Sequence, residues 1–199
     1  MHVRGTPASG KTILARLLSE FLIKKKQKVV FIQRWDSTMM AVDYLAEMCQ
    51  EQGYLEGWEV DILTLDIVFI IDEAQQTYVQ SDLWYDVIKT QKERGTGPRF
   101  CLFSSYGSPI TGSTNYPGDT TPIVLGQSQR VSLTISHNSD APDICLFYNE
   151  AEYKDVLRRY CEQNFNYFTL DADAEQYLFE FTSGHPGAVV SILERITMV

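Results

Sequence analysis

The sequence predicts a three-layer α/β/α fold with a mainly parallel central sheet, followed by a small C-terminal helical lid. Short apolar runs alternate with segments of helical spacing, a pattern typical of sheets whose parallel strands are joined by helices. A glycine-containing loop over residues 5–12 leads directly into the first of these helices. From about residue 137 onward only helical segments follow. We therefore expect an α/β core over residues 1–136 and a lid over residues 137–199.

The loop has the sequence Gly-Thr-Pro-Ala-Ser-Gly-Lys-Thr, which fits the Walker A pattern G-x-x-x-x-G-K-[ST]. Its two glycines allow the backbone N–H groups to point inward at phosphate oxygens. The lysine is expected to reach the β- and γ-phosphates, and the last threonine to offer its hydroxyl to Mg²⁺. The following helix would direct its positive N-terminal end at the anion. The predicted nucleotide-binding residues are Gly5, Thr6, Pro7, Ala8, Ser9, Gly10, Lys11, Thr12 and Ile13.

The next segments read as a helix, a strand and a second helix. Apolar residues of the first helix recur at helical spacing, namely Ile13, Leu14, Leu17, Leu18, Phe21 and Leu22. Residues 28–33 are predicted to form a buried strand. Asp36 and Ser37 are expected to cap a helix over about residues 38–52, which ends at Gly53. Residues 58–65 are compatible with either a turn or a short helix.

A second motif follows the apolar run 66–71, which ends in Asp72 and Glu73. Such a run is typical of a central parallel strand whose carboxyl end carries the chemistry. As a Walker B motif, Asp72 would hold the Mg²⁺ shell and Glu73 would orient and deprotonate the attacking water. A glutamate directly after the aspartate points to NTPases whose catalytic glutamate lies on the Walker B strand. In that class of NTPases an extra strand lies between the phosphate-loop strand and the Walker B strand. Residues 99–104 are the candidate, with Ser104 or Ser105 at its tip facing the γ-phosphate.

The remaining segments complete the core and the lid. Ser81 and Asp82 are expected to cap a helix over about 82–94, and residues 123–133 to resume strand character after a long loop over 106–122. In the lid, Asn149 and Asp171 are expected to cap two helices. These run over about residues 150–163 and 172–182, and a third helix covers about residues 187–197.

Composition limits the classes of function. The chain has 199 residues and a formal net charge of -9, which argues against a free-standing nucleic-acid binder. A cluster of lysines at 24–28 lies at a predicted helix end, where cations are favourable. Four cysteines without C-x-x-C spacing indicate reduced thiols in an intracellular protein. No membrane span or signal peptide is predicted. Because only four residues precede the loop, we expect the chain to be part of a longer protein.

With both motifs placed, the chain resembles AAA+-related P-loop ATPases, and among them the STAND-like branch. It is also similar along its length to the NTPase domain of Crinkler-type (CRN-like) proteins of fungi and oomycetes, on residues 4–12, 71–75 and 103–107. The resemblance implies ATP and Mg²⁺ as cofactors. It also implies that the Gly184-His185-Pro186 motif opens a lid helix, with Pro186 near the adenine. In that family the domain is joined to an effector domain, and the protein is secreted to act in a host nucleus or cytoplasm.

Two functions follow as alternatives. The first is an Mg²⁺-dependent ATPase that acts as a nucleotide-controlled switch, with nucleotide-dependent self-association. The second is a nucleotide-binding interaction module with little or no turnover. For the catalytic arginine of the first, Arg130 is preferred over Arg94 and Arg99, and a salt-bridged surface arginine is the alternative interpretation. Without a positioned arginine, hydrolysis is expected to be slow or to need a neighbouring subunit.

Overall fold

The computed structural model describes residues 1–55, 61–91, 95–105, 125–133, 145–164 and 169–197. Five strands form one parallel sheet in the order β2-β3-β4-β1-β5. They are β1 (His2–Arg4), β2 (Lys28–Ile32), β3 (Ile67–Ile71), β4 (Arg99–Ser104) and β5 (Arg130–Ser132). The predicted extra strand is confirmed, because β4 lies between the strand before the phosphate loop and the strand before Asp72.

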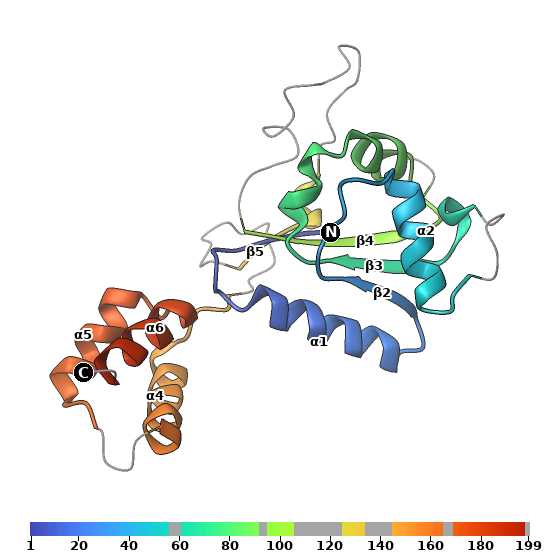
Figure 1. Ribbon diagram of the computed structural model, residues 1–199. Helices are drawn as coiled ribbons and strands as arrows, with labels where there is room; N and C mark the ends of the chain where they lie inside the picture. Colours follow the sequence, from blue (N-terminus) through green and yellow to red (C-terminus); the bar gives the residue numbers. More distant parts are fainter. Residues whose placement is uncertain (56–60, 92–94, 106–124, 134–144, 165–168, 198–199) are drawn as a thin grey trace.

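Helices cover both faces of the sheet (Figure 1). Helix α1 (Lys11–Lys24) lies on one face, and α2 (Ala41–Glu51) lies on the other with the π-helical segment η3 (Leu83–Lys89). Successive side chains of a strand point to opposite faces of the sheet, so each strand contributes residues to the hydrophobic core on either face. In β3, for example, Phe69 faces the α2 layer and Ile70 faces the α1 layer. The predicted three-layer α/β/α fold is therefore confirmed.

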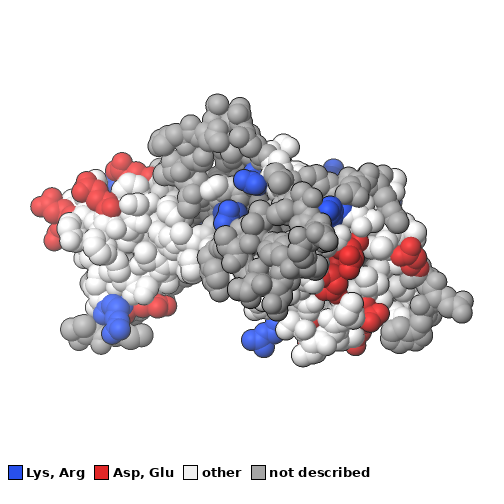
Figure 2. Space-filling view, turned by 90° about the horizontal axis from the view of Figure 1, so that it is seen from above, with Lys and Arg blue, Asp and Glu red and all other residues white. Residues whose placement is uncertain are grey.

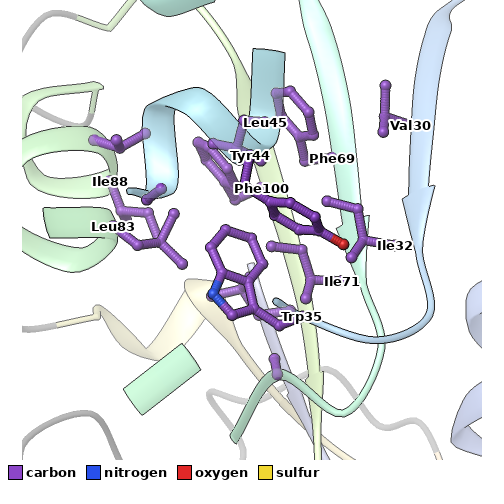
Figure 3. Packing of buried hydrophobic residues seen from close by; sticks show 14 of the residues in the cluster. Val30, Ile32, Trp35, Tyr44, Leu45, Phe69, Ile71, Leu83, Ile88 and Phe100 are labelled. Atoms are coloured by element: carbon purple, nitrogen blue, oxygen red, sulfur yellow. The ribbon is translucent and has the colours of Figure 1, made fainter. Parts of the chain in front are cut away.

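Aromatic side chains fill the larger core, between the sheet and α2 (Figure 3). The rings of Phe69 and Phe100 stack across neighbouring strands with their centroids 5.4 Å apart. Trp35 meets Tyr44 of α2 edge to face at 4.9 Å. The second pair joins α2 to the segment that follows β2, and α2 packs against β2 and η3.

Only half of the predicted apolar stripe of α1 is buried. Leu14, Leu18 and Leu22 pack against the sheet, whereas the other three residues are more than half exposed: Ile13 at 59%, Leu17 at 57% and Phe21 at 54%. The small buried residues Ala15 and Ser19 let the helix lie close to the strands. The sheet therefore covers a narrower face of α1 than the apolar spacing suggests.

The start of α2 corrects two predicted caps. The Asp36 carboxylate accepts hydrogen bonds from the Thr38 N–H at 2.8 Å and the Thr38 hydroxyl at 2.7 Å, so it holds a local turn. The N–H of Ala41, the first residue of α2, instead donates to Asp82 Oδ2 at 2.5 Å. Asp82 therefore caps a neighbouring helix, and its side chain makes no capping bond to its own helix.

The smaller elements differ from the sequence prediction in length. Two of these elements are short 3₁₀ helices, η1 (Ile62–Thr64) and η2 (Ala74–Val79). A further 3₁₀ turn, η4 (Gln127–Gln129), interrupts the strand predicted over 123–133, so that only β5 pairs with the sheet. The predicted loop at 106–122 and the candidate Arg94 lie outside the described residues.

The lid contains α4 (Glu150–Asn164), α5 (Ala172–Thr182) and α6 (Pro186–Thr197). Asn149 and Glu152 cap α4 reciprocally, each side chain accepting from the other's N–H at 2.9 Å, and Asp171 accepts from the Ala174 N–H at 2.8 Å. Both predicted caps are confirmed. The lid has its own hydrophobic cluster, formed by Tyr153, Leu157, Leu178, Val189 and Leu193. The predicted boundary at 136/137 lies outside the described residues.

The four cysteines are free thiols. Burial raises the pKa of Cys49 and of Cys101 to about 11, which keeps both thiols protonated at neutral pH. Across the described ranges, no helix combines the length and the apolar character needed to cross a membrane.

Candidate functional site

A cleft of about 600 Å³ opens at the carboxyl edge of the sheet, between the phosphate loop and the ends of β3 and β4. Its lining includes most of the predicted nucleotide-binding residues and the predicted catalytic glutamate. The residues are Pro7, Ala8, Gly10, Lys11, Thr12, Ile13, Glu73, Gln75 and Ser105. The fold thus brings both sequence motifs to one cleft.

The two motif glycines are required for different reasons. Gly10 has a φ of 94°, in the left-handed region that favours glycine. At Gly5 the limit is space, because a Cβ atom there would lie 2.9 Å from Ser9 Oγ and 3.1 Å from the Leu133 Cβ. The buried Ser9 hydroxyl has no hydrogen-bond partner within the described part of the chain. The loop is thus held in a tight curve.

Lys11 is buried and folded back onto its own loop, with Nζ donating to the Thr6 carbonyl at 2.7 Å. Burial lowers the pKa of Lys11, and the nearby carboxylates of Glu73 and Asp72 act in the opposite direction. A phosphate group in the cleft would offer Lys11 oxygen acceptors with a full charge in place of a neutral carbonyl.

The Walker B segment places one carboxylate in the interior and the next one in the cleft. Asp72 is 2% exposed, and its Oδ1 accepts from the Glu73 N–H at 3.0 Å. Glu73 has a φ of 49°, a left-handed conformation that is strained for a residue with a side chain and is often found at functional sites. This turn brings the Glu73 side chain to the cleft beside Lys11.

Gln75 is a site residue that the sequence did not indicate. Its Nε2 donates to Glu73 Oε2, and its Oε1 accepts from the Ser105 N–H at 3.1 Å. Gln75 therefore holds the Glu73 carboxylate against the end of β4. The only feature of the sequence that could have indicated a site role for Gln75 is its position two residues after Glu73. The local pattern does not distinguish Gln75 from its neighbour Gln76.

Thr12 and Asp72 have the donor chemistry that Mg²⁺ requires. Mg²⁺ prefers oxygen ligands and is usually held by one or two protein groups together with phosphate oxygens and water. Thr12 lines the cleft, and the buried Asp72 directly precedes Glu73, which also lines it, so both oxygen donors belong to segments that reach the cleft. Among the residues that the structure describes, no group of three or more His, Cys, Asp and Glu side chains could hold a metal ion by itself.

Ser104 does not occupy the predicted place. Its side chain is completely buried, and its Oγ lies 2.7 Å from His2 Nε2, which is also 3.2 Å from the Tyr78 hydroxyl. Of the two serines predicted at this strand tip, Ser104 thus faces the interior, and the role beside the γ-phosphate stays a prediction. Successive residues of a strand face opposite sides, and it is Ser105 that lines the cleft.

The two candidate arginines that the structure describes each begin a strand. Arg130 begins β5 in register with His2, two residues before the carboxyl edge, and Arg99 begins β4. Arg99 forms an exposed ion pair with Asp66 at 3.0 Å, as the alternative interpretation expected. Strand β5 runs from Arg130 toward the cleft rather than ending there, and the role of Arg130 as the catalytic arginine stays a prediction.

A hydrogen bond links the phosphate loop to the lid. Pro186 opens α6 as predicted but is absent from the lining of the described cleft, so its contact with adenine stays a prediction. The residue that reaches the loop is His185, whose Nε2 lies 2.8 Å from Thr6 Oγ1. His185 belongs to the noted Gly-His-Pro motif, but no feature of the sequence indicated its partner.

Neither a protein-family model nor a curated protein sequence matches the chain. Several solved structures, however, are similar to the chain. AMPPCP-bound DnaA from Aquifex aeolicus superposes with a TM-score of 0.50 and 14% identity, over 98% of this chain and 53% of that one. The Aeropyrum pernix ORC2 protein in ADPNP–ADP complexes gives a TM-score of 0.51 and 16% identity, over 94% and 52%.

The chain thus spans about half the length of each of these proteins. With the strand order and the phosphate loop, the likeness shows that the chain has a P-loop NTPase fold. The closer resemblance to Crinkler-type domains is not tested by these neighbours and stays a prediction.

Proposed function

We propose that this chain is an Mg²⁺-dependent nucleoside triphosphatase that uses ATP and acts as a nucleotide-controlled switch of the AAA+/STAND-like class. One observation carries the proposal: Lys11, Thr12 and Glu73 line a single cleft beside the buried Asp72. Both structural neighbours were solved with adenine nucleotides or their analogues, which supports ATP as the ligand.

Each residue has a distinct role in the proposed reaction. The loop N–H groups and the N-terminal end of α1 bind the phosphates, and Lys11 leaves the Thr6 carbonyl to contact them. Thr12 and Asp72 would hold Mg²⁺, which neutralises charge on the phosphate oxygens when bound. Glu73, oriented by Gln75, accepts a proton from the attacking water.

Two variants test the proposal. Glu73→Gln should bind ATP normally but should slow hydrolysis about 10²-fold or more, because the general base is lost. Lys11→Ala should lose most of its ATP affinity. Calorimetry measures binding, and steady-state phosphate release measures turnover. Glu20→Gln, at an exposed acid on α1, is the matched control. Normal turnover by Glu73→Gln would contradict the role of Glu73, and unchanged ATP affinity in Lys11→Ala would contradict the phosphate loop.

A second candidate function is a nucleotide-binding interaction module with little turnover. None of the residues described as lining the cleft is an arginine, so negative charge that develops in the transition state has fewer cationic partners. Tight ATP binding with no phosphate release above the Lys11→Ala background would select this function.

We also propose, from the resemblance to Crinkler-type proteins, that the domain works with a linked or associated effector domain and acts in a host nucleus or cytoplasm. Nucleic acid is not the expected partner of this chain alone. On the face shown in Figure 2, acidic side chains gather toward both ends of the molecule, and the basic side chains of the described residues lie singly rather than as one continuous surface. Salt-dependent DNA binding by the chain would contradict this expectation.

A further inference from the structure

Thr6 is contacted on two sides that have different chemistry. Its carbonyl oxygen accepts from Lys11 Nζ at 2.7 Å and from the Ser9 N–H at 3.3 Å, both within the phosphate loop. Its hydroxyl lies 2.8 Å from Nε2 of His185, which belongs to the lid. Thr6 therefore joins the lysine that would contact phosphate to the first turn of α6.

The hydrogen bonds around His185 define its tautomer. Nδ1 accepts from the Ala188 N–H at 3.2 Å, so Nε2 carries the proton and donates to the Thr6 hydroxyl. His185 immediately precedes α6 and thus caps it. The ring of Phe147 packs edge to face against the imidazole at 4.9 Å. The imidazole is held in one orientation while it bonds to the loop.

Two more contacts bring the lid side directly against the loop. A Cβ atom on Gly187 would lie 2.4 Å from the Ala8 Cβ, so the backbone of α6 touches the loop at this point. A Cβ atom on Gly10 would lie 3.6 Å from Leu146 Cδ1. Alternate loop residues, at positions 6, 8 and 10, therefore face residues beyond position 144. A shift of the loop cannot leave the start of α6 undisturbed.

We infer that Thr6 and His185 form a relay that reports the occupancy of the phosphate loop to α6. This inference rests on the proposed nucleotide binding. When phosphate oxygens attract Lys11 Nζ, Thr6 loses one of the bonds that hold its carbonyl, and its hydroxyl transmits the change to the cap of α6. By linkage, the position of α6 alters nucleotide affinity by the same factor. His185 is thus a positioning residue that bonds to the loop.

Two substitutions separate the relay from simple helix capping. His185→Asn keeps an effective capping acceptor, but its shorter side chain cannot reach Thr6. Thr6→Val keeps the shape of the threonine and removes the hydroxyl. Ser191→Ala, on the exposed face of α6, is the control because Ser191 lies away from the loop.

The test combines calorimetry of AMPPCP binding with amide hydrogen exchange of α6, both on the full chain. In the unmodified chain, AMPPCP should change exchange in the first turn of α6 about fivefold or more, in the range of typical coupling between sites. His185→Asn should still bind AMPPCP but lose this response. Thr6 belongs to the phosphate loop, so the affinity of Thr6→Val is measured first; at saturating AMPPCP this variant should also lose the response, and the double variant should lose no more than either single one. Ser191→Ala should respond normally.

A full response of α6 in His185→Asn, or additive losses in the double variant, would overturn the relay while leaving the proposed function intact. If the unmodified chain binds no AMPPCP by calorimetry, the proposed function fails and the relay with it. The two failures are therefore distinguishable in one set of measurements.

Discussion

At the scale of the residue, the buried side chain of His2 links two strands of the sheet. Its imidazole is buried between the Ser104 hydroxyl on β4 and the Tyr78 hydroxyl. Burial, together with the positive charges of Arg4 and Arg130, lowers the pKa of His2 to about 4. The neutral imidazole thus joins β1 to β4, and this bond explains why Ser104 is unable to serve the cleft.

The lowered pKa of His2 predicts a pH dependence of stability. Between the unfolded pKa of 6.5 and the folded pKa of about 4, the unfolded state binds more protons, so acidification favours unfolding. Above pH 6.5 His2 is neutral in both states and does not lower the free energy of unfolding. As the pH drops to about 4, its protonation in the unfolded state lowers the free energy of unfolding by up to about 3 kcal/mol. Urea unfolding at about pH 7 and about pH 5 should show a larger loss for the natural chain than for His2→Gln. Equal losses would mean that His2 titrates normally in the fold.

At the scale of the element, side chains from distant segments determine where helices begin. The sequence pattern predicted the cap of α2 at Asp36 and Ser37, whereas the structure uses Asp82, 41 residues away from Ala41. The caps at Asn149 and Asp171 were predicted correctly because both bond within their own first turn. Local pattern therefore identifies a cap only when the cap is local.

Substitution of the two acids tests this difference. Asp82→Ala leaves the buried N–H of Ala41 without its acceptor and should lower the free energy of unfolding by about 0.5–2 kcal/mol, the usual cost of a lost cap. Asp36→Ala removes only a surface turn and should have a smaller effect. Chemical denaturation of both variants makes the comparison. An equal or larger effect of Asp36→Ala would show that the local turn, and not Asp82, controls the start of α2.

The same distinction explains how much of the site could be predicted. The phosphate loop, Asp72 and Glu73 were located because each depends on a run of consecutive residues. Whether Ser104 or Ser105 reaches the cleft depends on which side of the sheet each side chain faces at the end of β4. The position of Arg130 depends on the register in which β5 pairs with β1. Gln75 and the contact of His185 with Thr6 arise only when separate segments fold together. Sequence therefore predicted the chemistry of the site better than its supporting contacts.

At the scale of the whole molecule, the cleft opens where the strands end, whereas the two candidate arginines that the structure describes begin their strands. Lys11 is the one cation among the described residues that line the cleft. Arg99 and Arg130 begin their strands at the amino edge, where Arg99 is occupied with Asp66. A neighbouring molecule could present such an arginine to the cleft without any change in the fold. A second cation for the transition state would then come from another copy.

This arrangement predicts that hydrolysis depends on protein concentration. If a second copy supplies an arginine, phosphate release per mole of chain should rise with concentration and level off once association is complete, since a supplied arginine commonly accelerates such reactions about 10³-fold or more. Mixing with Lys11→Ala gives the control, because that variant cannot bind ATP but keeps its arginines. Added at a concentration where the unmodified chain is slow, it should raise the rate. A constant rate per chain, unaffected by Lys11→Ala, would show that each molecule completes its own site, and would place the missing cation within the same chain.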